Sequence, residues 1–112
     1  MINEQLLKKL GVLGEVKLYI DVLLKNNIKP KQIIIYGSLV KQKTHQYSDI
    51  DLAVVSENFG EDSIEAMMTL SKLTIGISDR IEPIALSSHD LLNRYHSLIG
   101  EIKKYGKVIY TS

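Results

Sequence analysis

The sequence contains no cysteine, which excludes disulfide bonds and thiolate metal sites. It also carries little net charge, because fourteen lysines and arginines oppose thirteen aspartates and glutamates to give +1. Bulk electrostatics therefore favours neither nucleic acid nor an anionic membrane as a direct partner. No apolar run approaches the roughly 18 residues that cross a membrane, and the first residues lack the basic and apolar regions of a signal peptide. We expect a cytoplasmic protein without membrane association.

The 112 residues are 45% hydrophobic and 24% charged, as in an ordinary globular protein. This length provides for one hydrophobic core and leaves no room for a second module, so we expect a single domain over residues 1–112. The six tyrosines show no pattern for stacking bases. His45, His89 and His96 lack metal-ligand spacing and are expected at the surface or in helix caps.

The stretch from Ile33 to Val55 combines two features. A β-branched run ends in the turn Gly37-Ser38, and ten residues later Asp49 and Asp51 open a second apolar strand. Side chains two positions apart on a strand point to the same face, and like charges there are destabilising unless a cation or a hydrogen-bond network compensates them. Divalent metals require oxygen ligands brought together in this way, so the two aspartates form the first candidate site.

The remaining pattern predicts alternating helices and strands. Helical spacing begins at a cap on Asn3 and runs to about Asn26, with a break near Gly11 and Gly14. The later elements are expected as strand 32–36, loop 39–48, strand 49–55, a helix capped by Asp62 or Ser63, strand 80–86, a short helix from Ser87 or Ser88 to 94, helix 97–105 and strand 107–110.

This order of elements predicts an α/β (α+β) fold in which helices flank a small mixed sheet. Pro83 predicts that its strand is shortened or lies near a sheet edge, because proline cannot donate to a ladder. The methionines of the helix after residue 62 are expected to fill gaps in the core.

The spaced motif resembles a known signature. Gly37-Ser38, ten residues, then Asp49-Ile50-Asp51 between two strands is similar to the motif of the polymerase-beta-like nucleotidyltransferase superfamily. The form Ser48-Asp49-Ile50-Asp51-Leu52 and the closing segment 101–110 resemble its minimal nucleotidyltransferase branch. The resemblance covers about residues 30–110, and it implies the fold of that superfamily.

The resemblance implies a metal site and an acid triad. Asp49 and Asp51 would hold two Mg²⁺ ions, which neutralise charge on the attacking and leaving oxygens during nucleotidyl transfer. Glu82 matches the third carboxylate of the family, where aspartate is usual and one methylene shorter. An alternative is that Glu82 is a surface residue paired with Arg80 or with a lysine.

The nucleotide end of the site would be formed by the turn. Gly37 lets the backbone approach the triphosphate of ATP, and the Ser38 hydroxyl with nearby N–H groups would bind a phosphate oxygen. Lys41 occupies the basic position of the family motif, and Gln42 stands where many relatives have glycine. Lys41 and Lys43 are alternatively only solvated loop residues.

Members of this branch commonly act as antitoxins of HEPN-domain ribonuclease toxins. The resemblance thus implies transfer of AMP from ATP to a hydroxyl, with a tyrosine of a HEPN toxin as the acceptor and a hetero-oligomer of the two proteins. The chain lacks the Arg-x(4–6)-His motif of the toxin itself. An alternative function is a catalytically inactive module that neutralises the toxin by binding. A third, transfer to a small molecule, usually involves an added acceptor domain.

Overall fold

The computed structural model describes residues 1–41, 48–59, 63–93 and 95–112. Over these residues the chain forms α1 (Glu4–Lys9), α2 (Leu13–Lys25), β1 (Gln32–Tyr36), β2 (Ile50–Val55), the 3-10 turn η1 (Glu57–Phe59), α3 (Ser63–Lys72), β3 (Ile81–Leu86), the 3-10 turn η2 (Asp90–Leu92), α4 (Ser97–Tyr105) and β4 (Lys107–Thr111).

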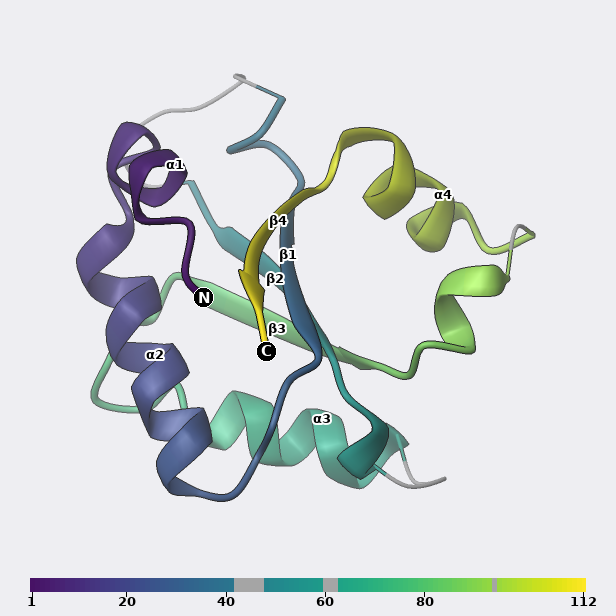
Figure 1. The fold of residues 1–112 in the computed structure, drawn as a ribbon, viewed down its shortest axis with the longest axis horizontal. Helices are drawn as coiled ribbons and strands as arrows, with labels where there is room; N and C mark the ends of the chain where they lie inside the picture. Colours follow the sequence, from purple (N-terminus) through teal and green to yellow (C-terminus); the bar gives the residue numbers. More distant parts are fainter. Residues whose placement is uncertain (42–47, 60–62, 94) are drawn as a thin grey trace.

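The four strands form one mixed sheet in the order β3-β2-β1-β4 (Figure 1). β1 pairs antiparallel with both β2 and β4, and β2 pairs parallel with β3. β3 is thus an edge strand, as Pro83 predicts. The mixed sheet with flanking helices confirms the predicted fold class.

Helices cover both faces of the sheet. Alternate side chains of β1, namely Ile33 and Ile35, enter a core shared with α1, α2 and α3, whereas Ile34 enters a smaller core with Ile99 and Ile102 of α4. Figure 1 shows α4 separated by the sheet from α1 to α3. Because side-chain direction alternates along a strand, the position of each residue in β1, β2 and β3 determines which helices it faces.

The first predicted helix is divided into two. Asn3 caps α1, its side-chain oxygen accepting the Leu6 N–H at 3.2 Å, as predicted. Gly11 has φ of 76°, a left-handed conformation that glycine adopts without strain, and α2 begins two residues later. The predicted break near Gly11 is confirmed.

Two predictions about local structure are wrong. Met67 and Met68 are 38% and 69% exposed, because α3 buries Ala66 and Leu70 against the sheet and turns the methionines outward. The predicted short helix before Arg94 is only the three-residue turn η2, with the Ser87 hydroxyl accepting the Asp90 N–H at 3.1 Å. The predicted cap at Asp62 lies outside the described residues.

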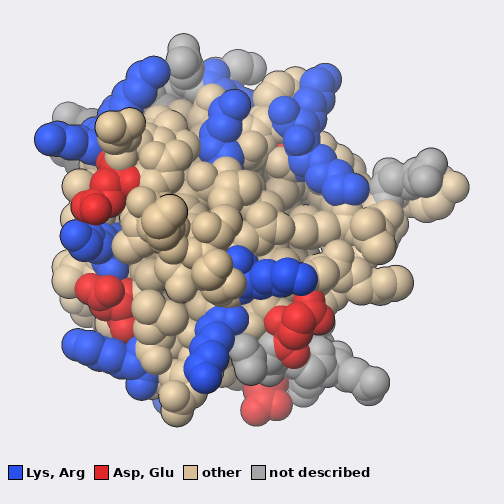
Figure 2. Space-filling view, viewed as in Figure 1, with Lys and Arg blue, Asp and Glu red and all other residues tan. Residues whose placement is uncertain are grey.

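Basic and acidic side chains are interspersed on the face shown in Figure 2, which agrees with the small net charge. In the part of the chain that the structure describes, no helix combines the length and apolarity needed to traverse a lipid bilayer.

Candidate active site

Three polar side chains form a row across the sheet at the end where β2 and β3 begin. Asp51 of β2 is paired in register with Tyr36 of β1 on one side and with Glu82 of β3 on the other. In these strands Ile34, Ala53 and Ile84 share the face that packs on α4, and Tyr36, Asp51 and Glu82 lie two positions from them. All three therefore point toward the α4 side.

Asp49 lies just outside the strand that was expected to carry it. β2 begins at Ile50, so the predicted boundary is one residue too early; Asp49 is exposed, whereas the neighbouring Ser48 and Ile50 are buried. Its charge nevertheless acts on Asp51 and raises the pKa of that carboxyl. The two aspartates thus belong to one electrostatic cluster with Glu82.

Gly37 brings the chain close to the Asp51 carboxylate. Its φ is 82°, and a Cβ added at this position would overlap the Asp51 side chain. The Lys41 N–H then donates to the Gly37 carbonyl at 3.2 Å, so residues 37–41 form a single helical turn. Only glycine meets both constraints, the left-handed backbone and the close approach. Ser38 lies in this turn, beside the acidic cluster.

The cluster is crowded with negative charge. The pKa of Asp51 is raised to about 6, first by burial and then by the charges of Glu82, Asp49 and Glu101. The pKa of Tyr36 is raised to about 12 by burial and by Asp51, Glu101 and Glu82. Tyr36 is therefore a protonated hydrogen-bond donor at neutral pH. The carboxylates repel one another, which is the situation that a bound cation relieves.

Lys41 connects the turn to α4. Its ammonium forms an ion pair with Glu101 and lies 4.7 Å from the centroid of the Tyr105 ring. Both partners come from α4, and both groups of the ion pair are about one-third exposed. Lys41 is thus anchored beside the acidic cluster, and its predicted alternative as a merely solvated residue is not what the structure contains. Lys43 and Gln42 lie outside the described residues.

Glu82 is not paired with Arg80, one of the alternatives for this residue. The Arg80 guanidinium instead donates to Glu15 of α2 at 3.0 Å. Glu82 is exposed at the sheet edge and faces Asp51. Its side chain is therefore available to the acidic cluster.

The donor set has the right chemistry for Mg²⁺, since carboxylate oxygens are the ligands that hard divalent cations prefer. Among residues 1–41, 48–59, 63–93 and 95–112, however, no three acidic or histidine side chains converge tightly enough to form a complete metal site. Asp51 and Glu82 are neighbours on paired strands, so two carboxylates of the kind that Mg²⁺ prefers lie side by side at this edge of the sheet.

Two residues of this cluster were not expected from the sequence. Tyr36 is the last residue of β1, and its place immediately before Gly37 was the available signal. Glu101 is 60 positions from Lys41 in the chain, and no sequence motif near it indicates a place in the site.

Of the two described histidines, His96 caps α4 by accepting the Leu98 N–H at 3.2 Å, as predicted.

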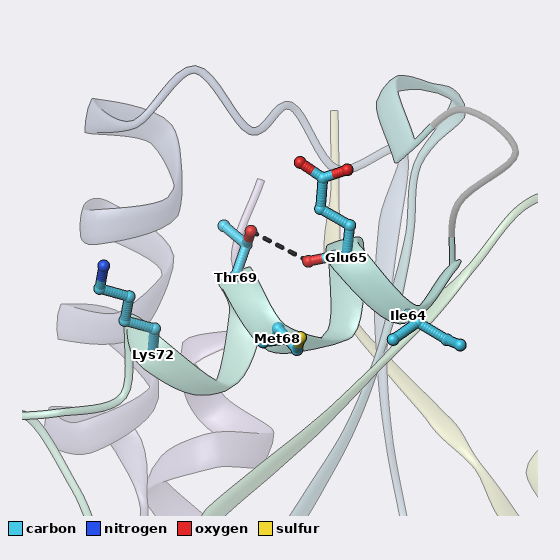
Figure 3. Close-up of a pocket in the computed structure, with 5 residues that line it drawn as sticks. All are labelled: Ile64, Glu65, Met68, Thr69 and Lys72. Atoms are coloured by element: carbon cyan, nitrogen blue, oxygen red, sulfur yellow. Dashed lines mark hydrogen bonds between the residues drawn. The ribbon is translucent and has the colours of Figure 1, made fainter.

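A hollow on the outer face of α3 is separate from this cluster (Figure 3). It is lined by Ile64, Glu65, Met68, Thr69 and Lys72, all from that helix. The Thr69 hydroxyl donates to the Glu65 carbonyl within the helix at 3.0 Å. No residue of the acidic cluster lines this hollow.

A family model described as "Polymerase beta, Nucleotidyltransferase" matches residues 19–112. Among solved structures, a protein described as a nucleotidyltransferase from Sulfolobus solfataricus is similar at a TM-score of 0.62 and 17% identity, over 87% of this chain and 78% of that chain. No curated protein sequence matches the chain.

Two toxin–antitoxin structures share the same fold. One, solved with AMP-PNP, has a TM-score of 0.54 and 22% identity over 89% of this chain and 75% of that chain. The other is a mutant of the toxin–antitoxin pair MntA–HpeT, in which two aspartates two positions apart are replaced by glutamate. Its TM-score is 0.57 at 21% identity, over 88% of this chain and 73% of that chain. At these identities the likeness shows a shared fold.

Proposed function

The chain belongs to the polymerase beta nucleotidyltransferase family, and we propose that it transfers AMP from ATP to a hydroxyl group of a partner protein. The observation that carries this proposal is the row Tyr36-Asp51-Glu82 with Asp49 at its edge, placed against the Gly37 turn. Carboxylates beside a tight glycine turn are suited to a triphosphate and its counter-ions. We treat residues 1–112 as one catalytic domain that acts in the cytoplasm.

Asp49, Asp51 and Glu82 are the residues that would hold Mg²⁺. Two ions are proposed, because nucleotidyl transfer by the two-metal mechanism uses two. When bound, the ions supply charge neutralisation for the attacking and leaving oxygens. Burial, and after it the repulsion from Glu82, Asp49 and Glu101, raises the pKa of Asp51 to about 6, and cation binding would offset the repulsion. This carboxyl is mostly ionised at pH 7.5, so it is ready to act as a ligand.

ATP would be bound through the turn at residues 37–41. Gly37 has no side chain between its backbone and the triphosphate, and the Ser38 hydroxyl adds a donor to a phosphate oxygen. Lys41 lies at the end of the turn with its ammonium beside the cluster. In this arrangement the α-phosphorus would face the carboxylates. The acceptor oxygen would form the new bond to phosphorus and lose its proton to Glu82, while the bond to pyrophosphate breaks and pyrophosphate leaves.

The proposed acceptor is a tyrosine of a HEPN ribonuclease toxin, and the chain is proposed to act as the antitoxin in a complex with it. The fold shared with two toxin–antitoxin structures, one of them with AMP-PNP, supports this assignment. The mutation of an aspartate pair in the MntA–HpeT structure parallels the spacing of Asp49 and Asp51. The exposed acidic cluster, with Asp49 and Glu82 open to solvent, leaves access for a side chain that a partner brings.

A second function, neutralisation of the toxin by binding alone, is favoured by one observation. The three acids do not converge on a metal position in the described structure. Against it, a binding module gains nothing from the crowding of Asp51, because that repulsion destabilises the fold unless a cation relieves it.

The test uses the protein encoded by the neighbouring reading frame, provided that it is a small helical protein with an Arg-x(4–6)-His motif. Both proteins are mixed with Mg²⁺ and labelled ATP, and the ribonuclease activity of the partner is measured afterwards. We expect label on the partner and loss of its ribonuclease activity. Both effects should disappear with Asp49→Ala plus Asp51→Ala. Neutralisation that survives this double change would overturn the proposal in favour of binding alone.

A further inference from the structure

A network of side chains joins α2 to the end of the sheet where β2 and β3 begin. The Arg80 guanidinium donates through Nη1 to Glu15 of α2 at 3.0 Å and through Nε to the main-chain carbonyl of Ser48 at 3.0 Å. The Ser78 hydroxyl pairs with the other oxygen of Glu15 and accepts the Arg80 N–H at 3.1 Å. Arg80 thus has partners in its own turn and in two other segments of the chain, α2 and the residues before β2.

Two contacts of Arg80 lie on either side of Asp49 in the chain. Ser48, whose carbonyl accepts from the Arg80 side chain, directly precedes Asp49 and is only 5% exposed. Ile50, which directly follows Asp49, donates its N–H to the Arg80 carbonyl at 2.8 Å. The backbone on both sides of this exposed aspartate is therefore held by one residue. That residue lies two positions before Glu82 in the chain.

The geometry, rather than the charge, of Arg80 is suited to this role. Its positive charge is matched by Glu15, so the pair adds little net field at the acidic cluster. The planar guanidinium presents donors in fixed and different directions, and here they reach a carboxylate and a carbonyl at once. A lysine ammonium has no such fork, although it retains the charge.

We propose that Arg80 is a positioning residue for the acidic cluster. It fixes segment 48–50 to the start of β3 and so fixes the position of Asp49 relative to Glu82, and Glu15 holds its guanidinium in place. This inference rests on the proposed function of the cluster. Groups that orient metal ligands from behind typically change metal affinity or activity by about 10–100-fold when they are altered.

The experiment compares Arg80→Lys with wild type by two measurements. The first is thermal unfolding against Mg²⁺ concentration without ATP, which reports metal binding by the whole chain. The second is label transfer to the partner against Mg²⁺ and against ATP. We expect the Mg²⁺ concentration for half-maximal stabilisation to rise about tenfold or more, and the transfer rate to fall by a similar factor, with KM for ATP changed less than about threefold.

Lys17→Gln is the matched control, because it removes an exposed ion pair with Glu4 at 3.3 Å, and both residues belong to helices α1 and α2 and not to the strands of the cluster. It should leave the Mg²⁺ dependence unchanged. If Arg80→Lys fails to fold, Glu15→Gln decides, because it removes the charge that pairs with the guanidinium and leaves Arg80 in place. A smaller shift of the Mg²⁺ half-point, about threefold, is then expected.

The proposal is overturned if a folded variant is half-maximally stabilised at the same Mg²⁺ concentration as wild type. If wild type shows Mg²⁺ stabilisation but no label transfer, the proposed function fails, and the half-points of the variants still decide the role of Arg80. If wild type is not stabilised by Mg²⁺ at all, both inferences fail together.

Discussion

Replacing Asp51 by Asn is expected to stabilise the fold while it abolishes the proposed transfer of AMP. The Asp51 carboxylate is half-buried opposite Glu82, with Asp49 nearby, and its pKa is raised from 3.8 to about 6. A carboxyl whose pKa is higher in the folded protein contributes stability below its unfolded pKa and loses that contribution as the pH rises through its folded pKa. At pH 7.5 the ionised Asp51 therefore lowers the free energy of unfolding.

The magnitude follows from the size of the shift. The difference between about 6 and 3.8 is about 2 pKa units, and each unit corresponds to about 1.4 kcal/mol, or about 3 kcal/mol in all. Asp51 is only partly buried, so solvent screening reduces this to about 1–2 kcal/mol. By linkage the difference should shrink to about half near pH 5, between the unfolded and folded pKa values.

The assay is urea unfolding of wild type and Asp51→Asn at pH 7.5, 6 and 5 without divalent cations. Asp21→Asn serves as the control, because Asp21 is an exposed aspartate of α2 outside the cluster. It should stay within about 0.5 kcal/mol of wild type. The reasoning is refuted if Asp51→Asn is no more stable than wild type at pH 7.5, or if its advantage does not narrow as the pH falls.

Three other substitutions test separate parts of the account. Gly37→Ala should abolish transfer, because the added Cβ displaces the Asp51 carboxylate. Gly76→Ala has the same left-handed backbone, φ of 85°, with open space around it, so it should cost about 1 kcal/mol of stability and keep activity; equal transfer by the two variants would contradict the close approach. Lys41→Met should raise KM for ATP about tenfold, since a charged hydrogen bond contributes about 1.5–3 kcal/mol. Initial rates at varied ATP concentration measure this KM, and an unchanged value would show that the lysine does not bind nucleotide. Tyr19→Phe should lower the free energy of unfolding by about 1 kcal/mol without affecting transfer, because its buried hydroxyl donates a 2.8 Å hydrogen bond to a main-chain carbonyl of α3; urea unfolding measures this loss.

The turn at Gly37 and the strands around it were accessible from sequence because their signals are local. A β-branched run predicts β1, and a Gly-Ser pair directly after it predicts a tight turn. The structure adds why glycine is required there, since the positive φ and the nearby Asp51 carboxylate act together. The pairing of Asp51 with Glu82 required more than local signals, because a helix and a turn separate the two strands.

The outward methionines show where helical spacing is ambiguous. α3 has apolar residues on several sides, including Ile64, Met67, Met68 and Leu70. Spacing indicates which of them share a face, but the sheet decides which face is covered, and it covers Ala66 and Leu70. The packing of α3 on the sheet therefore determines which of its residues are buried, and the sequence of the helix alone does not predict this packing.

Glu101 and Lys41 illustrate a limit of a different kind. Their ion pair links a turn and a helix that are distant in the chain. No sequence pattern in either segment predicts contact with the other. The contact follows from α4 packing on the same sheet face as Tyr36. The Glu101 carboxylate is beside the cluster because of how α4 packs on the sheet, which the sequence of neither segment indicates.

The proposed function requires that the cluster around Asp51 directs transfer of AMP, which carries the α-phosphate of ATP. The most direct measurement incubates the protein, the proposed partner protein and Mg²⁺ with ATP labelled either at the α-phosphate or at the γ-phosphate. We predict label on the partner from α-labelled ATP alone, with γ-label released in pyrophosphate and both results lost with Asp49→Ala plus Asp51→Ala. Partner label from γ-labelled ATP, or none from either nucleotide, would contradict the account.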